Sequence, residues 1–510
     1  MGGSIAKGTD QAGSPLARGL GFLDATMIVM GSMIGSGIFV TPAESARLVG
    51  SPGWLLAAWA LTGLMTVSGS LCCAEVTAMM PRAGGQYVFL REAYGPAVGF
   101  LFGWSFFLVV QTGAIAAVSV AFAKYLGVFV PWVSASNVLI APIAVGHTGY
   151  AISLTTEQLF AVALILGLAV ANTRGLGVGR WIQNPSTIAK TLALAALIVV
   201  GLAVGLRSNA GAAAWASSWW KPAPGTFPTA GAIGPLAMAM VLGRAMIGPL
   251  FSQTSWNNVT FLGAETRNPE WTLPRALVVG CGSVVTLYLL ANVAYIVTLP
   301  LSGIQHPPED RVGTAMLAAC LGPAGAYAMA AAILVSTFGC VNGSTLAGAR
   351  VSYAMARDGL FFRQVGTVNA RRVPALAILA QGAWASLLAL TRTVTTDPAT
   401  GATTFGNVYN QLLEYLVSVD LFFYVLLVGT VVILRRRAPG AARPFRTPLY
   451  PLPAIVYIGL ATLLIVDLVY LAPTTSGMGF AIALAGLPVY AVWSRLGTAV
   501  EEPSVVVETP

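Results

Sequence analysis

Two short polar runs interrupt apolar segments that are otherwise typical of continuous helices. The first is GSG, Gly35 to Gly37, within IVMGSMIGSGIFVTP. Where a new helix starts, its first backbone N–H groups are unpaired, and together with the positive end of the helix dipole they bind carboxylates. Glycine also lets a ligand approach the backbone without a Cβ in the way. Gly35, Ser36 and Gly37 therefore predict a carboxylate site.

The second polar run is FSQTS, Phe251 to Ser255, which follows Pro249. A helix is expected to end here, so its last carbonyl groups are free to accept hydrogen bonds from an ammonium. We expect the carbonyl of Met33, at the first break, to contribute as well. A site with N–H groups on one side and carbonyls on the other is complementary to a zwitterion, and we predict that it binds an α-amino acid.

The elements that position these residues are predicted to be membrane-spanning helices. Of the 510 residues, 56% are hydrophobic and 9% are charged, whereas about 25% of a soluble domain is charged. Apolar stretches long enough to cross a hydrocarbon core of ~30 Å recur along the chain, without the alternation of barrel strands. We predict an all-α polytopic membrane protein with twelve transmembrane helices, centred near Met33, Val67, Leu108, Leu166, Leu197, Met246, Leu287, Thr337, Gly382, Phe423, Leu460 and Ala485.

The two interruptions fall in the first and sixth predicted helices. If the first ten helices form two inverted five-helix repeats, the breaks correspond, which is typical of a transporter with its site at the bilayer midplane. Close helix packing would also explain the glycines, but not the polar cluster from Ser252 to Asn258. The predicted parts are a cytoplasmic tail (1–20), the first repeat (21–206), the second repeat (230–434), two further helices (447–496) and a cytoplasmic C-terminal tail (497–510).

Charge and cysteine placement exclude several classes of protein. Most of the 27 Lys and Arg residues fall on one side when both termini share that side, so the positive-inside rule places both termini in the cytoplasm. This topology explains the net charge of +9 without a nucleic-acid partner. The five cysteines lie within or beside predicted spans, and no Cys/His spacing suggests a metal. No catalytic or cofactor-binding motif is present, so we predict no enzyme and no cofactor.

Five segments, in order, resemble the amino acid–polyamine–organocation (APC) transporters, and among them the L-type amino-acid transporters and their bacterial relatives. The segments are GSMIGSGIF (31–39), AEVTAMMPRAGGQYVFLREAYGP (74–96), FSQTSWNNVTFLGAETRNPEWTLPRAL (251–277), RVSYAMARDGLFF (350–362) and RPFRTPLYP (443–451). The resemblance implies two inverted five-helix repeats of the leucine-transporter type plus two helices, with the first and sixth helices unwound. It also implies alternating access.

The resemblance assigns roles to the residues at the breaks. The N–H groups of Ser36 and Gly37 would bind the substrate carboxylate, and the carbonyls of Met33, Phe251 and Thr254 its ammonium. Phe251 would also be the aromatic gate over the substrate. The other predicted contacts are Ile34, Gly35, Ser252, Ser255 and Asn257.

Lys190 lies in the fifth predicted helix, where the resemblance implies an ammonium that stands in for a sodium ion. An ionisable group inside a membrane is a functional candidate because burying its charge is costly. A side chain that reaches the cytoplasmic interface is the alternative. The first interpretation predicts transport that does not need sodium.

Four further polar residues are candidates for the pocket or its vestibule. Gln111 and Ser336 are predicted to line the pocket, with interhelical hydrogen bonding as the alternative. Arg244 would lie in the outer vestibule or reach the outer interface. Asp420, if it faced the pocket, would favour a cationic substrate; pairing within the bundle is the alternative.

Two departures from the family pattern refine the prediction. Gln253–Ser255 replaces a small glycine-rich stretch, which would narrow the pocket. Vertebrate members of the family that this chain resembles attach to a single-span glycoprotein, the heavy chain, by a disulfide from the loop between helices three and four. The corresponding segment here, 125–156, has no cysteine, so that partner is not expected. We predict a secondary active transporter of small to medium neutral L-amino acids in the plasma (inner) membrane, working by sodium-independent exchange or proton-coupled uptake. The alternatives are a cationic amino-acid or polyamine antiporter and a non-transporting amino-acid sensor.

Overall fold

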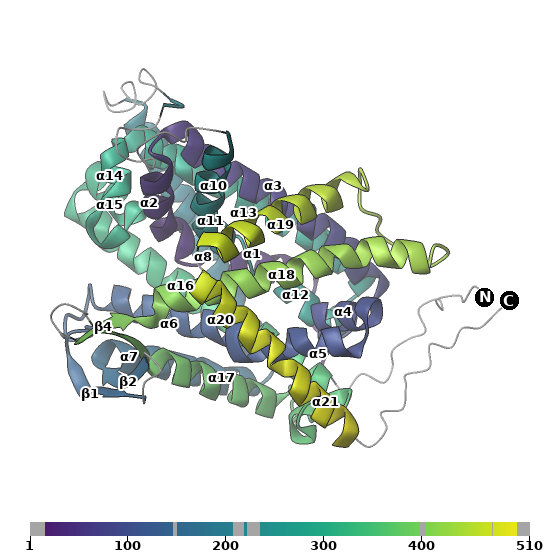
Figure 1. Ribbon diagram of the computed structural model, residues 1–510. Coiled ribbons are helices and arrows are strands. Elements are labelled where there is room, and N and C mark those ends of the chain that lie inside the picture. Colours follow the sequence, from purple (N-terminus) through teal and green to yellow (C-terminus); the bar gives the residue numbers. More distant parts are fainter. Residues whose placement is uncertain are drawn as a thin grey trace.

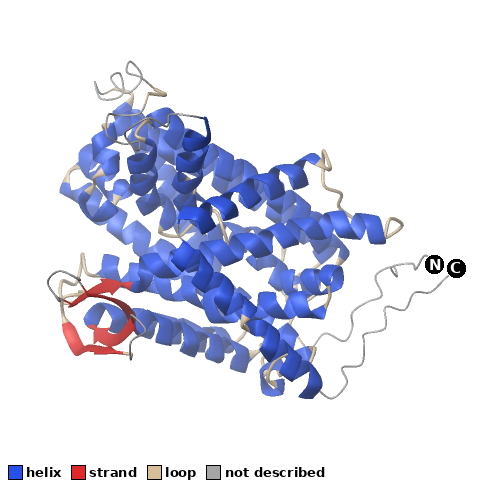
Figure 2. Ribbon diagram, viewed as in Figure 1, coloured by secondary structure: helices blue, strands red, loops and turns tan. Residues whose placement is uncertain are grey.

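The computed structural model describes residues 16–145, 150–207, 219–221, 235–396, 403–471 and 473–496. The predicted C-terminal tail and most of the N-terminal tail lie outside these residues. The described chain is mostly helical, and its long helices pack side by side in one bundle (Figure 1). Its strands gather at one corner of the molecule (Figure 2).

The helices of the first half include one π-helical turn and end before residue 207. They are α1 (Phe22–Met33), α2 (Gly37–Val49), α3 (Pro52–Met79), α4 (Gln86–Tyr94), α5 (Pro96–Ser105), the π-helical η1 (Phe106–Val110), α6 (Gln111–Leu126), α7 (Thr156–Thr173) and α8 (Leu176–Gly205). Polar residues fix some of the starts. The hydroxyl of Thr155 accepts a hydrogen bond from the Gln158 N–H at 3.2 Å, and Gln158 Oε1 accepts one from the Thr155 N–H at 2.9 Å. This capping box starts α7.

The second half begins at residue 235. Its helices are α10 (Pro235–Ala245), α11 (Ile247–Ser252), α12 (Asn258–Phe261), η2 (Gly263–Glu265), α13 (Pro269–Thr298), α14 (Leu301–Gln305), η3 (Pro308–Asp310), α15 (Val312–Leu321), α16 (Pro323–Arg357), η4 (Arg363–Gly366), α17 (Ala375–Leu390), α18 (Val408–Arg437), α19 (Leu452–Leu471), α20 (Pro473–Leu484) and α21 (Gly486–Leu496). The strands are β1 (Val138–Ala144), β2 (Tyr150–Thr155), β3 (Thr391–Thr396) and β4 (Thr403–Asn407).

Length and composition identify membrane-spanning helices within the described residues. Nine are long and apolar enough to cross a membrane, and the bent pair α1 and α2 makes a tenth. The spans predicted near Met246 and Gly382 correspond to shorter apolar helices, Met238–Ser252 and Ala375–Leu390. The prediction of a polytopic helical membrane protein is therefore confirmed.

The outer surface of the bundle is apolar. Leu192 and Val199 on α8 are exposed, as are Leu463 and Val466 on α19. A water-soluble monomer rarely exposes apolar surface of this extent, whereas lipid tails solvate it. These faces are those that the bilayer covers.

Packing places the broken helix α1 in the centre of the bundle. It contacts α8, α13 and α16. The helix α3 packs along α13, and α7 packs along α17. In the predicted order these two pairs are spans two and seven and spans four and nine, so each pair joins corresponding members of the two predicted repeats.

A four-stranded antiparallel sheet, in the order β1-β2-β3-β4, is a feature that the all-α prediction missed. It joins the loop after α6 to the loop after α17 through the pairing of Ala151 with Arg392. The sheet forms between segments that are far apart in the sequence, and a short strand has too few residues for its alternation to stand out in an apolar chain.

Candidate functional site

The first predicted break is present between α1 and α2. The helix α1 ends at Met33, Ile34 is extended with ψ 94°, and α2 begins at Gly37. The two helices are bent by 40° relative to each other. The first N–H groups of a helix have no intrahelical partner, and here those of Ser36 and Gly37 belong to the start of α2.

The second predicted break lies between α11, which ends at Ser252, and α12, which begins at Asn258. In between, Ser255 has a φ of +66°, a left-handed conformation that is rare for a residue with a side chain. Its N–H donates to the Tyr424 hydroxyl at 3.3 Å. Backbone strain of this kind persists only where the surrounding structure enforces it, and it often marks functional sites.

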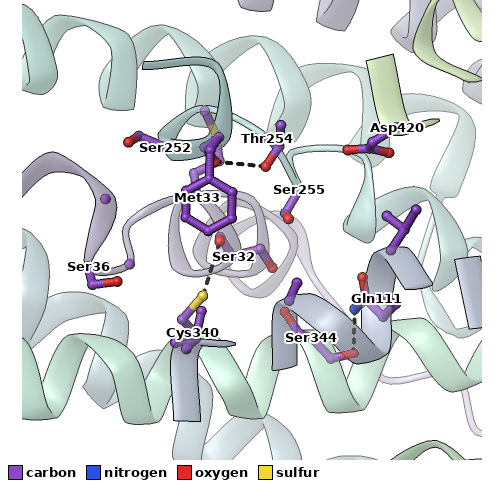
Figure 3. Close-up of a pocket in the computed structure, with 16 residues that line it drawn as sticks. Ser32, Met33, Ser36, Gln111, Ser252, Thr254, Ser255, Cys340, Ser344 and Asp420 are labelled. Atoms are coloured by element: carbon purple, nitrogen blue, oxygen red, sulfur yellow. Dashed lines mark hydrogen bonds between the residues drawn. The ribbon is translucent and has the colours of Figure 1, made fainter. Parts of the chain in front are cut away.

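A small cavity lies between the two breaks, bounded also by α6, α16 and α18 (Figure 3). Most of the predicted site residues line it. They are Met33, Gly35, Ser36, Gly37, Gln111, Phe251, Ser252, Thr254, Ser255 and Asp420. The two breaks, about 215 residues apart in the sequence, thus contribute to one site, as their position in matching repeats would require.

The carbonyl groups at the breaks already accept internal hydrogen bonds. The Met33 carbonyl accepts from the Tyr288 hydroxyl at 3.0 Å, and the Phe251 carbonyl accepts from the Thr254 hydroxyl at 2.8 Å. A carbonyl oxygen has two lone pairs. The Phe251 carbonyl also accepts from the Thr254 N–H, at 3.3 Å. The Met33 carbonyl can therefore accept one further donor, such as a ligand ammonium, whereas an ammonium at the Phe251 carbonyl would have to replace one of its two donors.

Lys190 on α8 is buried beside the first break, with 1% of its surface exposed. Its Nζ donates to the carbonyls of Gly31 at 2.5 Å, Ile34 at 2.7 Å and Ser336 at 3.3 Å. The side chain does not reach the interface, because all three partners lie inside the bundle. Its ammonium instead ties the end of α1 to α8 and α16, and the three carbonyls offset the cost of burying its charge.

Ser336 supports the break from α16, and its side chain lies outside the cavity lining. Its hydroxyl is within hydrogen-bond distance of the Ile34 carbonyl at 3.1 Å and the Gly35 carbonyl at 3.3 Å. The Ile34 carbonyl is thus surrounded by Lys190 and Ser336. The structure places these predicted residues around the backbone of the break.

Three other candidates, Ile34, Asn257 and Arg244, also lie outside the cavity lining. The Asn257 Nδ2 donates to Gln86 Oε1 at 2.5 Å, and the Asn257 Oδ1 accepts from the Tyr424 hydroxyl at 2.8 Å. These bonds tie α12 to α4 and α18. Arg244, at the end of α10, is exposed, and its charge interacts with that of Asp467 on α19.

Three polar residues of the lining were not predicted: Ser32, Cys340 and Ser344. The Cys340 thiol donates to the Ser32 carbonyl at 3.4 Å, and Gln111 Nε2 donates to the Ser344 carbonyl at 2.8 Å. Cys340 and Ser344 follow Ser336 at intervals of four residues, so they lie on one face of α16. That spacing of small polar residues is the signal that could have revealed them.

Further contacts link the segments that flank the two breaks. The Thr41 and Ser252 hydroxyls of α2 and α11 lie 3.2 Å apart. The Gly19 N–H donates to the Glu265 carbonyl at 2.9 Å. The Glu265 carboxylate in turn forms a fully buried ion pair with Arg350 on α16, at 2.9 Å.

The broken helices, the cavity between them and the buried ammonium of Lys190 define an integral membrane transporter. The family model described as "Amino acid permease" matches residues 20–488. The chain belongs to this family, and the resemblance to APC transporters is confirmed.

Several characterised proteins are similar along almost the whole chain. The serine/threonine exchanger SteT of Bacillus subtilis (strain 168) is 31% identical, over 93% of this chain and 96% of its own length. The large neutral amino acids transporter small subunit 2 of Homo sapiens is 29% identical, over 95% of this chain and 82% of its own. The b(0,+)-type amino acid transporter 1 of Mus musculus is 26% identical, over 88% and 82%.

Proposed function

We propose that this protein is a secondary active transporter that moves small to medium neutral L-amino acids across the plasma membrane by alternating access. The observation that carries the proposal is the cavity in which the start of α2 faces the end of α11. The substrate carboxylate would bind the N–H groups of Ser36 and Gly37. Its ammonium would bind the carbonyls of Met33, Phe251 and Thr254, and the contacts would be completed by Ile34, Gly35, Ser252 and Ser255.

The proposed topology has twelve spans, with both termini in the cytoplasm. Two inverted repeats, 21–206 and 230–434, would precede the two spans within 447–496. The packing of α3 along α13 and of α7 along α17 supports this arrangement, as do the two helix breaks at matching positions. In this scheme the shorter helices α10–α11 and α17 are the sixth and ninth spans.

Exchange of amino acids is the mode of transport that one relative favours. SteT is named a serine/threonine exchanger, and a small hydroxylated side chain suits a cavity lined by Thr254, Ser255 and Ser344. Proton-coupled uptake is the alternative coupling. The five cysteines are all free and none lies in 125–156, so we propose that no disulfide-linked heavy chain is needed.

We propose that transport does not use sodium, because the ammonium of Lys190 already occupies three carbonyls where a sodium ion would need oxygen ligands. Replacing external sodium with choline is expected to leave the initial rate of uptake unchanged within about 20%, since no step then depends on the ion. Uptake into proteoliposomes at equal osmolarity measures this. A rate that falls in proportion to sodium would contradict the proposal.

Phe251 is proposed as the gate over the bound substrate. Phe251→Ala is expected to lower the rate of exchange by about 10-fold while changing substrate affinity by about 3-fold or less, because a gate controls closure more than binding. Exchange in proteoliposomes gives the rate, and ligand-induced thermal stabilisation in detergent gives the affinity. Equal losses in both quantities would make Phe251 a simple binding residue.

Uptake of a panel of labelled amino acids into proteoliposomes tests the proposed function. Acceleration by unlabelled amino acid inside is expected for an exchanger, and acceleration by an inward proton gradient for a symporter. A folded protein that binds an amino acid but transports none would be a sensor. A cationic amino-acid or polyamine antiporter is the second candidate, and the presence of Asp420 in the cavity wall favours it.

A further inference from the structure

A second cavity adjoins the first, and the two share Thr254 and Asp420 in their walls. The second cavity lies among α3, the α11–α12 break, α18 and α19. Asp420 thus stands between the two. A ligand held at the helix breaks has its only acidic neighbour, among the described residues lining either cavity, at this boundary.

Among the described residues, two polar side chains in the wall of the second cavity are buried without partners. Asp420 has 7% of its surface exposed, and no hydrogen bond or ion pair of the described residues involves its carboxylate. Both side-chain amide atoms of Gln253 are buried and likewise unbonded. Buried polar groups and charges are normally paired. A carboxylate and an amide oxygen left open at a cavity wall would be satisfied by a ligand that donates hydrogen bonds.

Three aromatic residues line the second cavity, beside aliphatic ones such as Leu250 and Val417. The rings of Trp256 and Tyr424 have centroids 5.0 Å apart, and those of Tyr424 and Tyr457 lie 6.5 Å apart. All three residues line the cavity. Because the faces of aromatic rings attract cations, and Trp does so most strongly, rings beside a carboxylate favour an ammonium or a guanidinium over an anion.

The position of this boundary relative to the proposed carboxylate site fits the length of an amino acid. In the view of Figure 3, Ser36 and Asp420 lie at opposite ends of the first cavity, with Thr254 between them. An amino acid whose carboxylate binds at Ser36 and Gly37 would therefore extend its side chain towards Asp420. The second cavity would receive the end of a side chain longer than that of serine.

We propose that the second cavity is a side-chain subsite for a cationic group, and that amino acids ending in an ammonium or a guanidinium are substrates together with neutral ones. Asp420 and the Gln253 amide oxygen would accept the hydrogen bonds of the cation, and Trp256 and Tyr424 would cover it. This inference rests on the proposed function, because it uses the helix breaks to hold the α-carboxylate and α-ammonium.

Pairs of amino acids that differ only in the terminal cation test the subsite in the unmodified protein. Lysine and norleucine form one pair, and arginine and citrulline form the other. Each competes with labelled serine for uptake into proteoliposomes. Lysine is expected to inhibit at a concentration at least about 10-fold lower than norleucine, because a desolvated cation gains a carboxylate and aromatic faces. Norleucine equal to or better than lysine would overturn the inference.

Asp420→Asn removes the charge and keeps the shape. It is expected to raise the inhibitory concentration of lysine by about 10-fold and to change that of norleucine by about 2-fold or less, since only the charge pair is lost. Glu157→Gln is the matched control, because Glu157 on α7 is also 7% exposed and lines neither cavity. An Asp420→Asn variant with unchanged lysine inhibition would overturn the inference.

The outcomes separate this inference from the proposed function. If serine and norleucine are transported but lysine has no advantage, the subsite is refuted and the transporter stands. If a folded protein takes up no amino acid at all, the proposed function itself fails. Inhibition by putrescine as strong as that by lysine would show that no α-carboxylate is required. It would contradict the proposed binding of the α-carboxylate at Ser36 and Gly37.

Discussion

Lys190→Met is expected to abolish amino-acid transport. Methionine has nearly the length and volume of lysine, but it cannot donate to the carbonyls of Gly31, Ile34 and Ser336. A buried acceptor that loses its partner costs about 1–3 kcal/mol. The carbonyls of Gly31 and Ile34 belong to the end of α1. Losing their hydrogen bonds to Lys190 therefore frees the backbone at the binding site. We expect uptake to fall at least about 100-fold, which corresponds to about 2.7 kcal/mol.

Uptake by purified protein in proteoliposomes, together with the midpoint of thermal unfolding, measures both consequences. Lys124→Met is the control, because Lys124 is an exposed residue at the end of α6 and the substitution is the same. Lys190→Arg is also expected to be poorly active, since a planar guanidinium cannot reproduce a compact ammonium. Wild-type uptake by Lys190→Met would show that the three carbonyls need no cation.

Gly37→Ala is expected to lower transport by about 100-fold, whereas Gly35→Ala changes it by about 3-fold or less, because overpacking costs about 1–3 kcal/mol where neighbours cannot move. A Cβ on Gly37 would lie 2.9 Å from Ser252 Cβ and 3.1 Å from its Cα. A Cβ on Gly35 would meet only the Cys340 Sγ, at an ordinary 3.5 Å. The first substitution therefore pushes α2 away from α11, and the second does not.

The two alanine variants form a matched pair, because both glycines lie in one motif and line one cavity. Exchange rate and serine affinity should be measured for each. Equal and severe losses of transport in both variants would mean that the glycines are needed to let the substrate approach the protein backbone, more than for the contact of α2 with α11. Normal transport by both variants would show that the first break is not part of the binding site.

The helix breaks and much of the cavity lining could be predicted because their signals are local. Glycine and serine within an apolar run, or Ser and Thr after a proline, disturb a helical pattern within a few residues. The resemblance then assigned Lys190 to the same region. The breaks are confirmed as features of the fold, and the roles of the residues around them remain predictions.

Other parts depend on which segments meet in space. Ser344 and Cys340 enter the cavity because α16 packs against α1 and α6. The carbonyls around Lys190 converge because Ile34 is extended, a conformation that its residue type does not require. The second cavity likewise needs Gln253, Tyr457 and Asp420 to meet from three segments. These contacts join residues that are far apart in the sequence, so no short stretch of the sequence could predict them.

The small sheet has a mechanical consequence for the whole molecule. Its strands β2 and β3 pair across a separation of about 240 residues, and so they fasten the helices α6 and α7 to α17 and α18. We expect helices that are joined by strand pairing at one end to move as one rigid block. In the proposed alternating-access cycle, the movement that admits and releases a substrate would then occur relative to this block, in the half-helices on either side of the two breaks.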